Sequence, residues 1–185
     1  VQAIEDQRHN GGKAIGKVID VTDQEYQFVT LLALLFLLVT IRWQKGRFIG
    51  CGLFGLVYTA VNVDTGGVMA VKEIRFTDMQ LVKNIVPMIR DEMTVLEILN
   101  HPNIVQYYGV EVHRDRVYIF MEYCEGGLLL NLLTHGRIED EMVIQVYTLQ
   151  MLEGLYYLHQ SGVIHRDIKP ENILLDHNGV IKYVD

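Results

Sequence analysis

The sequence predicts an α+β fold in which an antiparallel sheet comes first and helices follow. Between residues 47 and 123, short segments rich in β-branched and aromatic residues alternate with polar turns, which is typical of strands. After residue 127, two stretches show helical periodicity instead. The 185 residues suffice for one domain, or for one domain with an extension, and they contain no internal repeat.

Five strands and one helix are expected in the first half of this fold. The predicted strands are 47–50, 56–63, 68–74, 105–112 and 116–123. A helix is predicted over 87–100, because a proline suits its first turn and Ile89, Met93 and Leu96 lie on one stripe. Gly126 and Gly127 then form a break before the predicted helices at 128–134 and 139–160.

The helix predicted at 139–160 carries a continuous apolar face. Its residues are Met142, Val146, Leu149, Leu152 and Tyr156. We expect this face to need a covering partner.

Composition limits the possible partners and compartments. Half of the residues are hydrophobic and 21% are charged, which supports a packed core. A net charge of −7 with scattered basic residues argues against nucleic acid as a partner. Cys51 and Cys124 are the only cysteines and have no metal-binding spacing, so we expect reduced thiols and a cytoplasmic location.

Residues 26–41 contain no charge and include an unbroken apolar run at 31–39. As a helix they would span about 24 Å, short of the roughly 30 Å hydrocarbon core of a bilayer. Membrane association is therefore not expected, and a buried helix or strand is the structural alternative. The polar residues before the run also argue against a cleaved secretory signal.

The glycine pattern at 50–55 is the first motif with possible chemistry. Gly50, Gly52 and Gly55 fit G-x-G-x-x-G, which alone suits a dinucleotide site, a phosphate-binding loop or a plain flexible turn. A dinucleotide site needs a helix directly after the glycines, whereas residues 56–63 are β-formers. The pattern therefore predicts a loop between antiparallel strands whose backbone amides can approach phosphate oxygens.

Further motifs follow this loop in a fixed order. They are Ala70-Val71-Lys72, the acidic residue Glu92 and the segment His165-Arg166-Asp167-Ile168-Lys169-Pro170-Glu171-Asn172. Together they resemble the eukaryotic protein kinase family. The segments MAVKEIRF, HPNIVQYYGVEVHRDRVYIFMEYCEGG and GRIEDE most resemble the MAP kinase kinase kinases of fungal osmotic and general stress pathways.

This resemblance implies a two-lobed fold. Residues 42–123 would form an N-lobe with a five-stranded antiparallel sheet and one helix, and 124–185 the first part of a helical C-lobe. Residues 1–41 would be an N-terminal extension with the apolar run. Because the segment stops at Asp185, where the Asp-Phe-Gly motif of the family begins, we expect this polypeptide alone to aggregate or to be inactive.

The resemblance also implies an ATP site. The residues that it places around the nucleotide are Ile49, Gly50, Cys51, Gly52, Leu53, Phe54, Gly55, Val57, Ala70, Lys72, Met121, Glu122 and Cys124. Lys72 would hold the α- and β-phosphates and pair with Glu92. Met121 would gate the back of the adenine pocket, and the backbone of Glu122 and Cys124 would bind the edge of adenine.

The catalytic residues implied by the resemblance are Asp167, Lys169, Lys72 and Glu92. Asp167 would orient the substrate hydroxyl or accept its proton, and Lys169 would neutralise charge on the transferred group. Asn172 and Asp185 would bind Mg²⁺. His165 would instead pack in the core beneath this site.

The expected function is a serine/threonine kinase that transfers the γ-phosphate of ATP to a MAP kinase kinase, under an upstream stress-pathway activator. A non-catalytic ATP-binding or scaffold protein and a membrane-tethered regulator that uses residues 26–41 are the alternatives. Transcript sequence beyond Asp185 would separate the first two, and fractionation would test the third.

Leucine stands at several positions where the resembled family usually carries serine or another small polar residue. They are Leu34, Leu35, Leu37, Leu38, Leu53, Leu56 and Leu128, with Leu130 a further candidate. A leucine at the tip of a phosphate loop gains no burial and offers no hydrogen bond. We hypothesise that CUG codons, which certain yeasts read as serine, encode these positions, so that the apolar run would disappear.

Overall fold

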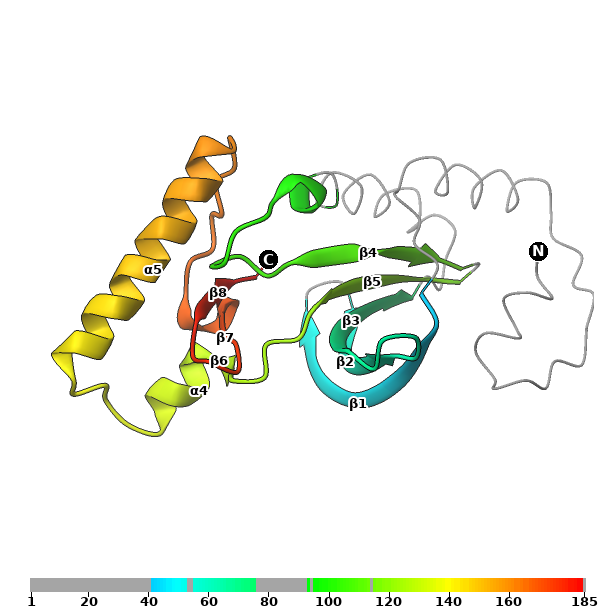
Figure 1. The fold of residues 1–185 in the computed structure, drawn as a ribbon, viewed down its shortest axis with the longest axis horizontal. Coiled ribbons are helices and arrows are strands. Elements are labelled where there is room, and N and C mark those ends of the chain that lie inside the picture. The colour runs from blue at the N-terminus through cyan, green and yellow to red at the C-terminus, as the bar shows by residue number, and fades with distance from the viewer. Residues whose placement is uncertain (1–40, 53–54, 76–92, 94, 114, 185) are drawn as a thin grey trace, which may run out of the picture. The chain divides into compact units, whose positions relative to one another are not determined.

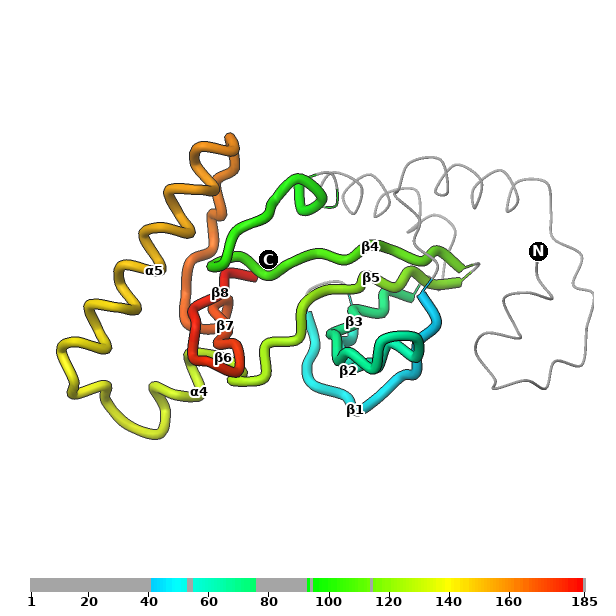
Figure 2. Tube along the Cα trace, in the orientation of Figure 1, coloured from blue at the N-terminus to red at the C-terminus, as the bar shows by residue number. Residues whose placement is uncertain are grey.

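The computed structural model describes residues 41–52, 55–75, 93, 95–113 and 115–184 (Figure 1). The chain divides into two compact units. Unit 1 contains the described residues up to Met93 together with 108–120, and unit 2 contains those of 94–107 and from Met121 onward. The tube in Figure 2 follows the chain from the curved strands of unit 1 to the long helix of unit 2.

The predicted five-stranded sheet is confirmed. Its strands are β1 (Trp43–Gly52), β2 (Gly55–Asn62), β3 (Val68–Arg75), β4 (Tyr107–Val112) and β5 (Arg116–Glu122). They lie in the order β1-β2-β3-β5-β4, and both the β1–β2 and β2–β3 pairs are antiparallel. The predicted turn at 64–67 joins β2 to β3, where the Asn62 side-chain oxygen accepts hydrogen bonds from two backbone amides.

Alternation along β3 gives the two faces of the sheet in unit 1 different roles. Met69 and Val71 are buried in an apolar cluster with Ala60, Tyr118 and Phe120. Trp43 packs against this cluster, with its ring centroid 5.0 Å from that of Tyr118 and 5.5 Å from that of Phe120. Because successive strand residues point to opposite faces, Ala70 and Lys72 face the other way.

Unit 2 combines helices with a small sheet. The helices are α4 (Leu129–Thr134), α5 (Glu141–Gln160) and the single 3₁₀ turn η1 (Pro170–Asn172). The strands β6 (Gly127–Leu128), β7 (Ile173–Leu175) and β8 (Ile181–Tyr183) pair in that order. The two helices confirm the sequence prediction, whereas the three-stranded sheet was not predicted.

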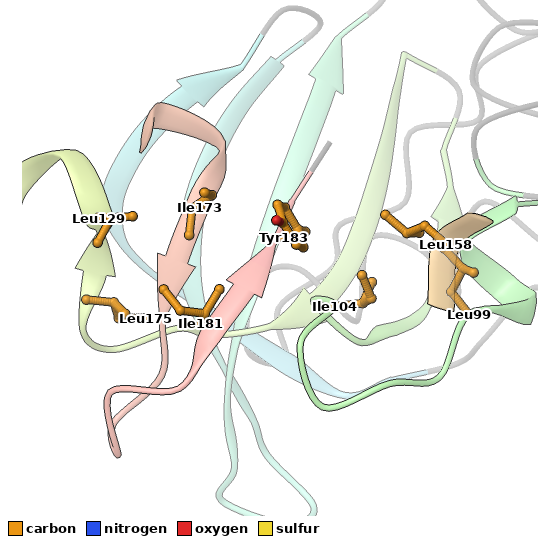
Figure 3. Packing of buried hydrophobic residues seen from close by; sticks show 8 residues of the cluster. All are labelled: Leu99, Ile104, Leu129, Leu158, Ile173, Leu175, Ile181 and Tyr183. Carbon is orange, nitrogen blue, oxygen red and sulfur yellow. The ribbon is translucent and has the colours of Figure 1, made fainter. Parts of the chain in front are cut away.

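The core of unit 2 is formed by side chains of the small sheet, α4, α5 and the segment 99–104, and Figure 3 shows its buried members. The buried members are Leu99, Ile104, Leu129, Leu158, Ile173, Leu175, Ile181 and Tyr183. Tyr183 donates a hydrogen bond from its hydroxyl to the carbonyl oxygen of Met151 at 3.2 Å. A Cβ atom at residue 154 would lie 3.0 Å from the Tyr183 ring, so Gly154 lets α5 approach β8 closely.

The predicted apolar face of α5 is on the surface of the described structure. Met142 is 73% exposed and Tyr156 is 68% exposed, and Val146, Leu149 and Leu152 are exposed as well. Other apolar side chains of α5, from Tyr147 to Leu158, pack on the core instead. The helix therefore carries apolar residues on both sides, as expected for an element with more than one packing surface.

Two predictions fall partly or wholly outside the described residues. Of the helix predicted at 87–100, the described part is helical at Met93 and at 95–98. The apolar run at 31–39 lies outside them. Among the described residues, none of the helices combines the length and the hydropathy that a bilayer-spanning segment needs.

The first turn of α4 provides a test of the proposed serine at position 128. Leu128 is the N-cap of α4, with φ −76° and ψ 139°, and its side chain makes no capping hydrogen bond. Serine is among the preferred N-cap residues because its hydroxyl accepts a hydrogen bond from a free backbone amide. We predict that Leu128→Ser stabilises the protein by about 1 kcal/mol, measured by thermal unfolding.

Leu130→Ser is the matched control for this prediction. Residue 130 lies inside α4 and is half-buried, so a serine there loses apolar contact without capping the helix. This control is expected to lower the unfolding temperature. A lower unfolding temperature for Leu128→Ser as well would contradict the capping argument.

Candidate functional site

The glycine pattern forms a tight hairpin between β1 and β2. Gly52 lies opposite Gly55, and Gly50 lies opposite Val57. The residues between them, Leu53 and Phe54, lie outside the described residues. A strand follows the glycines, as the sequence predicts, so this is not the strand-to-helix turn of a dinucleotide site.

Gly55 fits against the backbone of β3 with no space for a side chain. A Cβ atom at this position would lie 2.9 Å from the carbonyl carbon of Glu73. At Gly50, by contrast, nothing lies within 4 Å of a Cβ position. The two glycines therefore serve different purposes: Gly55 permits close packing of the hairpin on β3, and Gly50 keeps the hairpin surface open.

Lys72 lies directly below this hairpin. A Cβ atom at residue 52 would lie 3.4 Å from the Lys72 Cε and 3.8 Å from its Nζ, so the end of the lysine side chain reaches the backbone of Gly52. The side chain of Lys72 is carried by β3 at a residue that is 6% exposed. A buried ammonium under open backbone suits an anionic ligand such as a phosphate.

Two predicted adenine contacts share the face of Lys72. Val57 lies opposite Lys72 in the β2–β3 register, and Thr59 lies opposite Ala70. Side chains of directly opposed residues lie on the same face of a sheet. Val57, Ala70 and Lys72 thus form one surface in unit 1. Cys51 is exposed on β1.

The predicted adenine-edge segment lies at the end of β5, in unit 2. The backbone amide of Glu122 donates to the carbonyl oxygen of Gln106 at 2.8 Å. Cys124 is buried, and this burial, with a smaller contribution from the nearby charge of Glu122, raises the pKa of its thiol to about 12. At neutral pH Cys124 is therefore a small neutral side chain and no nucleophile.

Three of the predicted catalytic and metal-binding residues come together in the loop before β7. The Lys169 Nζ lies 2.7 Å from the Asp167 Oδ2. The Asn172 Nδ2 donates to the same carboxylate oxygen at 2.8 Å and to the Asp167 carbonyl oxygen at 2.9 Å. Asp167 is therefore oriented from two sides while its side chain is 59% exposed.

The chain makes an unusual bend directly before Asp167. Arg166 has φ 69° and is the one non-glycine residue with positive φ in the described part of the chain. Such a conformation costs about 1 kcal/mol or more, and it persists where the surrounding structure fixes it, often at functional sites. The η1 turn then closes the loop, with the Asn172 amide donating to the Lys169 carbonyl at 2.9 Å.

Electrostatics favour the charged forms of both partners in this loop. The hydrogen bond from Lys169, followed by that from Asn172, holds the pKa of Asp167 below its ordinary value despite partial desolvation. The same bond raises the pKa of Lys169. Asp167 is thus an ionised, positioned and accessible carboxylate, which is suited to orienting a hydroxyl group.

Asn172 presents one side-chain atom to the predicted metal site. Because Nδ2 of Asn172 is directed to Asp167, the amide oxygen is the atom that remains for a cation, and an oxygen ligand suits Mg²⁺. Asp185 lies outside the described residues. Within 41–184, excluding the gaps given above, no group of three or more His, Cys, Asp or Glu side chains could hold a metal ion.

Three further predictions concern these groups and their neighbours. His165 packs edge-on against Tyr183, with ring centroids 5.4 Å apart, in agreement with a supporting role beneath the loop. Glu92 lies outside the described residues, so the Lys72–Glu92 ion pair stays a prediction. Lys72 belongs to unit 1 and Asp167 to unit 2, so their convergence on one ligand likewise stays a prediction.

Comparison with known proteins gives the class of the molecule. Residues 43–185 match the protein kinase domain, which agrees with the glycine hairpin, the buried lysine and the Asp167 loop. The chain belongs to the protein kinase family.

Individual relatives show which members of that family are similar to the chain. Across its whole length the chain is 62% identical to the serine/threonine-protein kinase SSK22 of Saccharomyces cerevisiae, and it spans 14% of that protein. Over 92% of its length it is 66% identical to the MAP kinase kinase kinase SSK2 of the same yeast, and it spans 11% of it. Human mitogen-activated protein kinase kinase kinase 4 is 44% identical over 92% of the chain, which covers 10% of that relative.

The close packing of Gly55 leads to a stability prediction. Gly55→Ala places a methyl group against the Glu73 backbone, which cannot move without disturbing β3. We expect destabilisation by about 1–3 kcal/mol, as for other overpacked sites, measured by thermal unfolding. Gly50→Ala is the control, and we expect its unfolding temperature to stay close to that of the parent protein. Equal effects would contradict this argument.

The Asp167–Lys169 pair leads to a pH prediction. Since the pKa of Asp167 is lowered in the folded state, the pair persists at neutral pH and is lost only as the pH falls through that lowered value. Lys169→Met should move the pKa of Asp167 upward, as followed by carbon NMR of the carboxyl group. Glu171→Gln, the control, changes a neighbouring charge and should not raise this pKa. An unchanged Asp167 pKa in Lys169→Met would contradict the assignment.

Proposed function

We propose that the protein transfers the γ-phosphate of ATP to serine or threonine residues of a MAP kinase kinase, in a stress-activated MAP kinase cascade. The single observation that carries this proposal is the loop in which Lys169 and Asn172 orient an ionised, exposed Asp167. Similarity to yeast proteins named MAP kinase kinase kinases supports the choice of substrate. A cytoplasmic location and control by an upstream stress-pathway activator belong to the same proposal.

The proposed mechanism relies on positioning and charge neutralisation. The open backbone of the glycine hairpin and the Lys72 ammonium would hold the phosphates of ATP, and the surface of Val57 and Ala70 would contact adenine. Asp167 would orient the substrate hydroxyl towards the γ-phosphate, and Lys169 would balance charge on the transferred group. Asn172 and Asp185 would hold Mg²⁺, which neutralises phosphate charge.

A second candidate function is a non-catalytic ATP-binding or scaffold protein. The residues that support it are those of the hairpin and Lys72, because they could bind nucleotide without any transfer. The two candidate functions differ in their need for Asp167: phosphoryl transfer requires its carboxylate, whereas nucleotide binding alone does not.

The test is phosphoryl transfer by the full-length protein with Mg-ATP and a MAP kinase kinase. Asp167→Asn keeps the shape of the side chain but removes its charge, so we expect transfer to fall at least about 100-fold, whereas nucleotide affinity stays close to that of the parent. Glu139→Gln, an exposed carboxylate outside the loop, is the control and should leave the rate unchanged. Nucleotide binding without transfer by the parent protein would favour the scaffold alternative.

A further inference from the structure

Strand β8 directs one side chain away from the core of unit 2. Ile181 and Tyr183 are buried in that core, and Lys182 between them points to the opposite side. The Lys182 Nζ lies 2.8 Å from Glu122 Oε1 and 2.9 Å from Glu122 Oε2. The side chains are 11% and 21% exposed, so this is a largely buried ion pair.

Glu122 is also attached to the segment that leads into β4. Its Oε2 accepts a hydrogen bond from the Gln106 amide at 3.1 Å, and its own amide donates to the Gln106 carbonyl oxygen at 2.8 Å. Backbone and side chain of Glu122 are thus both held by Gln106. This double attachment leaves little freedom for the orientation of Glu122.

Segment 103–106 is in turn bound to β8. The Asn103 side-chain amide donates to the carbonyl oxygen of Ile181, and the Val105 amide donates to that of Tyr183, both at 2.9 Å. The Tyr183 amide donates back to the Asn103 carbonyl oxygen at 2.9 Å. Three segments of unit 2, namely 103–106, 121–124 and 181–183, therefore form one closed network through Glu122 and Lys182.

A gain in stability alone does not explain why such a buried ion pair is present. Removing two charges from water is costly, and well-packed apolar residues at such sites are often equally stable or more stable. Separating such a pair would leave an uncompensated buried charge, so the pair holds its two segments together in one arrangement. What this pair fixes is the segment of Met121, Glu122 and Cys124, beside the strand that precedes Asp185.

We propose that Glu122 and Lys182 are positioning residues for ATP: their ion pair fixes the adenine-binding backbone of 121–124 against β8. This inference rests on the proposed function, because it takes the backbone of Glu122 and Cys124 to contact adenine. It goes beyond that function by assigning a role to two side chains that do not touch the nucleotide.

The test uses the full-length protein, with initial rates measured against ATP at saturating MAP kinase kinase. Lys182→Met and Glu122→Gln each remove one charge, and we expect each to raise the KM for ATP about tenfold with a much smaller change in kcat, because misplaced binding groups weaken productive binding. The double variant Glu122→Lys/Lys182→Glu restores the pair in reverse and should recover most of the ATP affinity. Lys182→Arg, which keeps the charge, should stay close to the parent.

Arg42→Met is the matched control, because it breaks the exposed Arg42–Asp64 ion pair of unit 1. It should leave both constants unchanged. An unchanged KM for ATP in both single variants, or a reversed pair no better than the single variants, would overturn the inference.

Three further outcomes distinguish the inference from a structural role, from a folding defect and from failure of the proposed function. A merely structural role would lower the unfolding temperature and reduce kcat without a selective rise in the KM for ATP, which also counts against the inference. If Lys182→Met fails to fold, the near-isosteric Glu122→Gln and the reversed pair decide the question. If the parent protein itself neither binds nor uses Mg-ATP, it is the proposed function that fails.

Discussion

The two-residue alternation of β8 is the constraint on which unit 2 depends. Ile181 and Tyr183 must face the core, because both are almost completely buried among its members. This requirement leaves Lys182 no choice of direction and places its ammonium at Glu122. Core packing and the arrangement of the segment around Glu122 are thus set by the same three residues, and a shift of β8 by one position would disrupt both.

The loop that carries Asp167 follows a different principle. Asp167 and Lys169 are exposed, so they gain little from burial, and the loop depends on short hydrogen bonds and on the bend at Arg166 for its shape. His165 anchors the start of the loop on Tyr183, and Asn172 closes it through η1. An ionised and accessible carboxylate is in this way carried by a support that is itself well packed.

The sequence predicted the large elements because their patterns are long. Strand β1 begins at Trp43 rather than at residue 47, since its first residues pair with β2 through tertiary contacts that no local pattern reveals. Strands β7 and β8 have three residues each, too few for a periodicity, although the Asn178-Gly179 turn between apolar segments was a usable hairpin signal. The Glu122–Lys182 pair joins residues that lie 60 positions apart, so no local sequence pattern predicts it.

The two cysteines differ in a way that matters for chemical modification. Cys124 is buried and its thiol stays protonated, whereas Cys51 is exposed on the strand that leads into the glycine hairpin. An electrophilic reagent therefore encounters Cys51 first, and its adduct would lie within the glycine hairpin of the proposed nucleotide site. The Cys51 thiol is therefore a selective attachment site for covalent inhibitors and reporter dyes, because no other thiol is accessible in the described structure.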